Sequence, residues 1–201
     1  MENSKLAIVG LDCFFNQPFD SERFSALIYD GKTLENQDIN SVESLSILSK
    51  VSHQALKNCQ VDCNKNVALI TADSTAIAND NSAEIVVKQL SNLWNFSATS
   101  FSLDGKKDCL LKALEIAQIL LTAKQVDTVI IDVVNSDPHT NMVCGARIIK
   151  DYQIAQKNGD RIYADVESFT HISDNFSPSE AAIQQSCQRA LQQAKIKAAD
   201  I

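Results

Sequence analysis

The sequence predicts an α/β fold in which a mostly parallel sheet is flanked by helices. Residues 6–10 and 67–72 are short continuous apolar runs, which are typical of strands buried on both faces. Residues 45–59, 81–94 and 107–123 instead carry apolar side chains at helical spacing. Because strands and helices alternate along the chain, the strands are expected to lie in a largely parallel sheet.

The first half of the chain supplies three strands. The run 6–10 ends in Gly10 and is followed by a predicted helix at 20–30 and a polar loop at 32–41. The helix at 45–59 and the buried strand at 67–72 come next. After the helix at 81–94, residues 97–103 alternate in polarity and predict a third strand.

The second half begins with the most apolar helix, 107–123, which we expect to be buried on most sides. Further strands are predicted at 127–134, 141–150 and 161–170. In the last helix Ser177 caps the start, Pro178 fits the first turn and Glu180 completes a capping box. Its predicted buried face consists of Ile183, Cys187, Ala190, Leu191 and Ala194.

Composition narrows the class of protein. The chain has 201 residues, of which 45% are apolar, so we expect one globular domain with a sizeable core. Its net charge of -7 and the lack of a basic stripe argue against nucleic-acid binding. We expect no signal peptide and no membrane span. Six scattered cysteines predict free thiols and a cytoplasmic location: Cys13, Cys59, Cys63, Cys109, Cys144 and Cys187.

The sequence does not predict a metal or a cofactor. His53, Cys59 and Cys63 lack the second pair of ligands that a structural zinc site needs. Gly10 follows a strand without the other glycines of a dinucleotide-binding loop. His139 is expected to be solvated, and His171 has no evident partner.

Several segments, in order, resemble β-ketoacyl synthases, enzymes of the thiolase superfamily. Residues 8–15, Ile-Val-Gly-Leu-Asp-Cys-Phe-Phe, are similar to the opening motif of that family. Residues 159–164, Gly-Asp-Arg-Ile-Tyr-Ala, are similar to its "GDRIYA" motif almost letter for letter. Weaker similarity covers 55–72, 111–135 and 177–201. The short Leu-Ile-Tyr-Asp-Gly-Lys at 27–32 most resembles the ketosynthase-like domain of bacterial polyunsaturated fatty acid synthases.

This resemblance implies a thiolase-like fold with a five-stranded sheet flanked by helices. Residues 1–150 would form the N-terminal half, and 151–201 would contribute the first strand and helix of the second half. We expect the chain to be part of a larger multidomain protein. In the synthase subunit that it most resembles, such a domain stands beside an acyltransferase.

The resemblance also locates the catalytic nucleophile and predicts its loss. The family has a cysteine in the motif "VDTACSSSL", where this chain has Leu-Asp-Gly-Lys-Lys-Asp-Cys-Leu-Leu at 103–111. Counting from Asp104 or back from Leu111 places Lys107 at the position of the nucleophile. Cys109 is the alternative candidate, although two residues further along a helix it would point elsewhere. We favour a structural, partly buried thiol for Cys109.

Other departures from the family point in the same direction. Asp132 and Val133 replace a glycine pair and would fill the space that the family leaves open. The segment 143–147, Val-Cys-Gly-Ala-Arg, replaces an acidic glycine-rich run. The two catalytic histidines of the family would lie beyond Ile201. Lys106 and Lys107 predict a solvated turn, with an anion site for a carrier phosphopantetheine as the alternative.

The resulting hypothesis is a non-condensing, ketosynthase-like accessory domain of a polyunsaturated fatty acid or polyketide synthase. We expect it to act with an acyltransferase domain and an acyl carrier protein, and to form a homodimer through residues 97–103 or through an exposed apolar face. The alternative is an active acyl-transfer or condensing enzyme that uses Cys109 with histidines from a missing C-terminal half.

Overall fold

A computed structural model describes residues 5–15, 41–59, 66–73, 82–96, 98–104, 108–135, 143–170 and 179–200. Its strands form one six-stranded sheet in the order β3-β2-β4-β5-β1-β6. The strands are β1 (Leu6–Phe15), β2 (Val67–Asp73), β3 (Ser100–Asp104), β4 (Thr128–Asn135), β5 (Val143–Asp151) and β6 (Ala164–Val166). Several features predicted from the sequence lie outside the described residues: the helix at 20–30, Cys63, Lys106, Lys107, His139, His171, Ser177 and Pro178.

The predicted α/β class is confirmed, but the sheet is mixed, and the sixth predicted strand belongs to it, so that it has six strands where five were expected. Strand β2 pairs in parallel with β3 and with β4. Strand β5 is antiparallel to β4 and to β1, and β6 is antiparallel to β1. The reason lies in the short connection between β4 and β5, residues 136–142, because parallel neighbours need a crossover of about a dozen residues or more.

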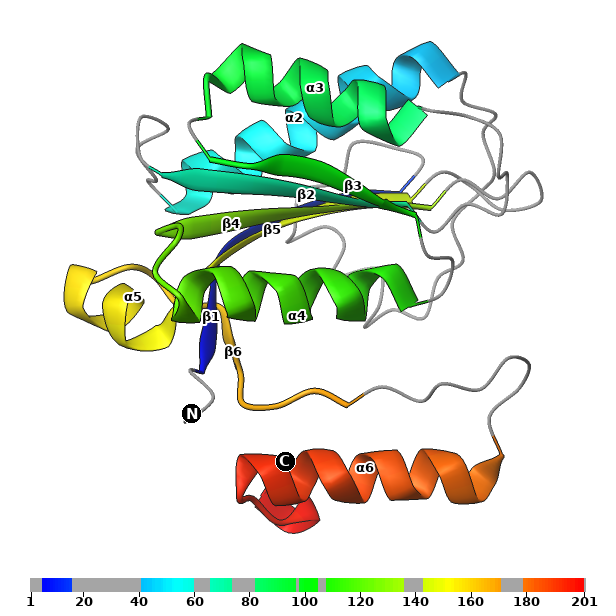
Figure 1. Ribbon diagram of the computed structural model, residues 1–201, viewed down its shortest axis with the longest axis vertical. Coiled ribbons are helices and arrows are strands. Elements are labelled where there is room, and N and C mark those ends of the chain that lie inside the picture. The colour runs from blue at the N-terminus through cyan, green and yellow to red at the C-terminus, as the bar shows by residue number, and fades with distance from the viewer. Residues whose placement is uncertain are drawn as a thin grey trace.

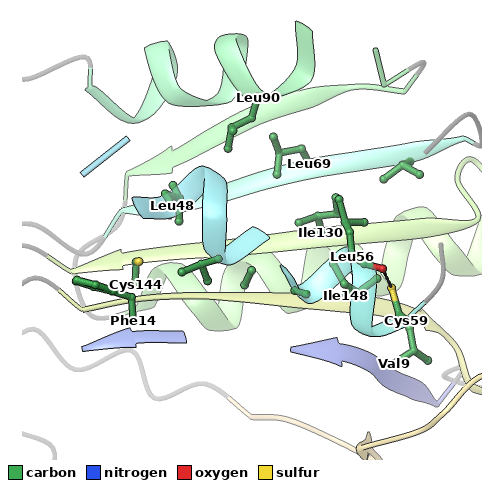
Figure 2. Packing of buried hydrophobic residues seen from close by; sticks show 14 of the residues in the cluster. Val9, Phe14, Leu48, Leu56, Cys59, Leu69, Leu90, Ile130, Cys144 and Ile148 are labelled. Atoms are coloured by element: carbon green, nitrogen blue, oxygen red, sulfur yellow. Dashed lines mark hydrogen bonds between the residues drawn. The ribbon is translucent and has the colours of Figure 1, made fainter. Parts of the chain in front are cut away.

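Helices cover both faces of the sheet (Figure 1). Helices α2 (Ser41–Cys59) and α3 (Ser82–Trp94) lie on one face, and α4 (Cys109–Thr122) lies on the other. Alternate residues of each strand therefore enter different cores. Ile130 and Ile148 pack below α2 with Leu48, Leu69 and Leu90 (Figure 2). On the opposite face, Ile70, Ile131 and Ile149 pack against α4.

Helix α4 is buried along one stripe only, contrary to the expectation for 107–123. Cys109, Ala113, Ala117 and Leu121 face the sheet, whereas Ile119 is 64% exposed. The small side chains of the stripe bring the helix close to the strands. Because the described residues form a single sheet on one side of α4, its outer apolar residues stay in contact with solvent.

Gly10 explains how β1 and α2 come so close together. A β-bulge interrupts the pairing of β1 with β5 between Ile8 and Gly10. A Cβ atom at Gly10 would lie 2.5 Å from the carbonyl oxygen of Ala55 and 3.0 Å from Cβ of Cys59, both in α2. Only glycine leaves room for this approach of the helix to the strand.

A short helix that was not predicted from the sequence follows β5, just after the expected boundary between residues 150 and 151. Helix α5 (Tyr152–Asn158) is capped by Asp151, whose side chain accepts hydrogen bonds from two backbone N–H groups. Gly159 ends it in the left-handed conformation, at φ 73°. The strand predicted at 161–170 is correspondingly shorter. It pairs along the edge of the same sheet with β1 over residues 164–166.

The last helix differs from the prediction at its start and on its buried face. Helix α6 (Glu180–Ala194) is capped by Ser179, whose hydroxyl accepts a hydrogen bond from the N–H of Ala182. None of its residues is buried, so the face predicted from Ile183, Cys187, Ala190, Leu191 and Ala194 is not covered. Figure 1 shows α6 beyond the extended segment after β6, on the side of α4. In the described part of the chain, no helix is long and apolar enough to cross a membrane.

Candidate functional site

The start of α4 is the place where the sequence predicted the former nucleophile. Strand β3 ends at Asp104 and α4 begins at Cys109, with Asp108 as its N-cap. The side chain of Asp108 makes no capping hydrogen bond to the helix. Lys107, the family position of the nucleophile, lies outside the described residues, so its assignment remains a prediction. The helix predicted at 107–123 begins two residues later than expected.

Cys109 is the first residue of this helix, but its thiol is buried. Only 2% of the residue is exposed, and it packs with Ala72 and Ala113 in the core between α4 and the sheet. Burial raises the pKa of the Cys109 thiol, and the charges of Asp73 and Asp108 raise it further. Backbone N–H groups of Cys109 and Leu110 act in the opposite direction without overcoming burial. A thiol in this environment stays protonated near neutral pH and is a poor nucleophile.

The two residues that replace the family's glycine pair lie on opposite faces of the sheet. Val133 is partly buried against the core between α4 and the sheet. Asp132 instead faces α2, where its Oδ1 lies 2.9 Å from Oγ of Ser52. The prediction that both side chains fill the same space is therefore wrong for Asp132. Successive side chains of a strand alternate between its faces, and only one of two neighbours can face α4.

Arg147 lies on the same face of the sheet as α4, and no role for it was predicted from the sequence. It belongs to β5, pairs across the sheet with Ile131, and is partly buried on the face that carries α4. Burial lowers the pKa of its guanidinium group, whereas Cys13 of β1 raises it. This chain has Arg147 in the segment that replaces the acidic glycine-rich run of ketosynthases, and that substitution is the signal that the sequence offered. It places a cationic group on the α4 side of the sheet.

The remaining candidates lie apart from the start of α4. His53 is exposed on α2, and Cys59 is buried with its Sγ 3.2 Å from the carbonyl oxygen of Leu56. In the described ranges, Cys13, Cys109, Cys144 and Cys187 are free cysteines. Among the residues that the structure covers, no three His, Cys, Asp or Glu side chains converge as metal ligands would.

Comparison with solved structures identifies the class of fold. Ketosynthase domain KS8 of OzmH, from the oxazolomycin synthase of Streptomyces albus, matches 96% of this chain with a TM-score of 0.75 and 17% identity. The ketosynthase of module 1 of the bacillaene synthase from Bacillus amyloliquefaciens matches 97% with a TM-score of 0.77 and 14% identity. The chain covers 61% and 52% of these two structures, respectively.

A third similar structure is the AntDE ketosynthase, described as bound to its acyl carrier protein AntF. It matches 98% of this chain with a TM-score of 0.79 and 12% identity, and the chain covers 71% of it. The chain therefore has the thiolase-like fold of ketosynthases. No protein-family model and no curated protein matches its sequence.

Proposed function

We propose that this chain is a non-condensing, ketosynthase-like accessory domain of a polyketide or polyunsaturated fatty acid synthase. The observation that carries the proposal is the environment of Cys109. Condensing enzymes need a reactive thiolate at the start of a helix. Here the thiol at that place is buried among apolar side chains, with two carboxyl groups raising its pKa. Lys107 is the residue that sequence similarity aligns with the nucleophile.

The role that remains is to position other parts of the synthase in the cytoplasm. An acyltransferase domain and an acyl carrier protein are the proposed partners. Support for a carrier comes from the AntDE ketosynthase, a structural neighbour that is described as binding one. The test is acyltransferase output of the parent synthase with and without this domain. Loss of output on deletion supports a positioning role, and unchanged output contradicts it.

Self-association is part of the same proposal. Strand β3 lies at one end of the sheet, and no other strand among the described residues pairs with its outer edge. A second copy can continue the sheet at this edge. The exposed apolar residues Ile119 of α4 and Ile183 of α6 offer the alternative surface.

A thiol-acylation experiment tests the absence of condensing chemistry. The chain is incubated with a short acyl thioester, and acyl adducts are located by mass spectrometry of its peptides. We expect no acyl group on Cys109. Maleimide labelling of the exposed Cys187 provides a positive control for thiol chemistry. An adduct that forms in the wild-type chain and disappears in Cys109→Ser, but not in Cys187→Ser, contradicts the proposal.

The second candidate is an acyl-transfer enzyme that uses Cys109. One observation favours it: Cys109 is the first residue of α4, where backbone N–H groups point toward the thiol and lower its pKa. This function requires histidines from a further segment and a cleft that exposes the sulfur. The same acylation experiment distinguishes the two functions.

A further inference from the structure

Asp132 is a buried acid that the proposed function does not use. It lies in the middle of the sheet on β4, is 0% exposed and faces α2. Burial raises the pKa of its carboxyl group to about 7. A buried carboxyl group without a cation is normally neutral or fully hydrogen-bonded. Its hydrogen bonds therefore decide its protonation state.

The hydrogen bonds of Ser52 show where a proton is needed. Oγ of Ser52 lies 2.8 Å from the carbonyl oxygen of Leu48 and 2.9 Å from Oδ1 of Asp132. A serine hydroxyl has one proton and can donate to only one of these oxygens. If Ser52 donates to Leu48, its second contact is satisfied only when Oδ1 of Asp132 carries a proton and donates to Oγ. A neutral Asp132 that donates to Ser52 accounts for both distances, and so does a Ser52 hydroxyl that donates to an ionised Asp132. Burial without a cation favours the neutral form.

Two further oxygens next to this contact need a partner. Within the described residues, Oδ2 of Asp132 and Oγ1 of Thr71 are both buried and make no hydrogen bond. Thr71 and Asp132 are direct neighbours in the parallel pairing of β2 with β4. Alternation along each strand places both side chains on the α2 face, beside Leu69 and Ile130. Neighbouring strands lie about 4.8 Å apart, so the two side chains stand beside each other. Buried oxygens without a protein partner are commonly satisfied by an internal water molecule.

We propose that Asp132 is held as a neutral acid that donates to Ser52, and that Asp132 and Thr71 together bind one buried water molecule. The water accepts a hydrogen bond from the Thr71 hydroxyl and donates one to Oδ2 of Asp132. In this arrangement every buried oxygen of the cluster has a partner. Helix α2 is thereby joined to the centre of the sheet by a chain of hydrogen bonds: Asp132 to Ser52, and Ser52 to Leu48.

Among the described residues, no cation next to Ser52, Thr71 and Asp132 serves as a counterion of the Asp132 carboxyl group. In the described part of the chain, the cations on the elements that pack against it point elsewhere or are already paired. Lys50, His53 and Lys57 are exposed on α2, Arg147 lies on the opposite face of the sheet, and Lys150 pairs with Asp160. The remaining titratable groups on these elements bring no positive charge: Asp73 on β2, Asp12 and Cys13 on β1, and Cys144 on β5. Burial, above all, raises the pKa of Cys144 to about 12.

The protonation state is tested by nuclear magnetic resonance on the 201-residue chain. The side-chain carboxyl carbon of Asp132 is assigned with the variant Asp132→Asn and titrated between about pH 4 and pH 9. We expect its midpoint close to 7, well above the ordinary value of 3.8. Asp127, exposed just before the same strand, serves as the internal control. A midpoint for Asp132 below about 5 overturns the proposal.

The water is tested separately by oxygen-17 relaxation dispersion, which counts long-lived internal water molecules. We expect Thr71→Val to lose one such molecule, and the exposed control Thr99→Val to lose none. An equal count in the wild-type chain and in Thr71→Val overturns the water site. A crystal structure of the wild-type chain gives a second measurement that needs no variant. It must show a water within hydrogen-bonding distance of Oγ1 of Thr71 and Oδ2 of Asp132, and electron density without one overturns the site.

Discussion

The substitution Asp132→Asn is expected to stabilise the protein at neutral and alkaline pH. Asparagine has the shape of the neutral acid and carries no charge to bury. The pKa of Asp132 rises from an ordinary 3.8 to about 7 on folding. Each pKa unit corresponds to about 1.4 kcal/mol, so keeping the carboxylate ionised in the fold destabilises it by about 4 kcal/mol.

The sign of the pH dependence follows from proton binding. Between about pH 4 and pH 7 the folded chain holds a proton on Asp132 that the unfolded chain has released. The free energy of unfolding contributed by this group therefore falls as pH rises through that window, and it is constant above it. Asp132→Asn lacks this dependence, and its advantage over the wild type should grow across the same window.

The assay is urea unfolding of both proteins at several pH values, followed by far-ultraviolet circular dichroism. Taking the difference between variant and wild type cancels the titration of all other groups, including Glu84 and Asp165, whose pKa values are lowered by Lys88 and Lys5. Asp127→Asn, at an exposed position, should show no such difference. A difference between Asp132→Asn and wild type that stays constant from about pH 4 to pH 8 would refute the reasoning.

Three further predictions concern packing, thiol reactivity and assembly. Gly10→Ala should lower the free energy of unfolding by about 1–3 kcal/mol in urea titrations, because the added Cβ would lie 2.5 Å from a carbonyl oxygen of α2. Gly145→Ala is the control. Its added Cβ would lie 3.6 Å from the nearest atom, so the free energy of unfolding should change little. Ellman's reagent should modify the exposed Cys187 in the folded chain and Cys109 only after unfolding, and equal rates would contradict the buried position of Cys109. If the dimer forms through β3, Ser102→Pro should shift the mass measured by light scattering toward that of the monomer, because proline removes a backbone donor from the edge strand. An unchanged mass would favour the exposed apolar face as the dimer interface.

The parts of the fold that sequence predicts well are those with a strong hydrophobic period. The buried strand at 67–72 and the helix at 45–59 were found with small errors at their ends, because burial of one stripe or of both faces fixes their pattern. Helix α5 was missed although Asp151 and Gly159 are ordinary start and stop signals. It has only seven residues and buries only Ala155, which leaves no period to detect.

In α6 the hydrophobic pattern predicted a buried face that the structure does not have. Ile183, Cys187, Ala190, Leu191 and Ala194 have the spacing of a buried face, yet none of them is buried in this chain. Periodicity reports that a face is apolar and cannot report what covers it. Ser168 and Thr170 hold the helix through hydrogen bonds to its backbone carbonyl groups at Ala190 and Ser186. These contacts are polar and join residues that are 22 and 16 positions apart, and a hydrophobic pattern does not reveal them.

The start of α4 shows why the fold alone does not decide the chemistry. A helix N-terminus favours a thiolate by about 0.3–1 kcal/mol, which is less than one pKa unit. Burial of an ionisable group can raise the pKa by several units. At Cys109 burial wins, and the charges of Asp73 and Asp108 add to it, so the pKa rises despite the helical position. The Cys109 thiol thus remains in its protonated form although it lies at the start of a helix. Reactivity at this site depends on exposing the sulfur, and the acylation experiment measures that directly.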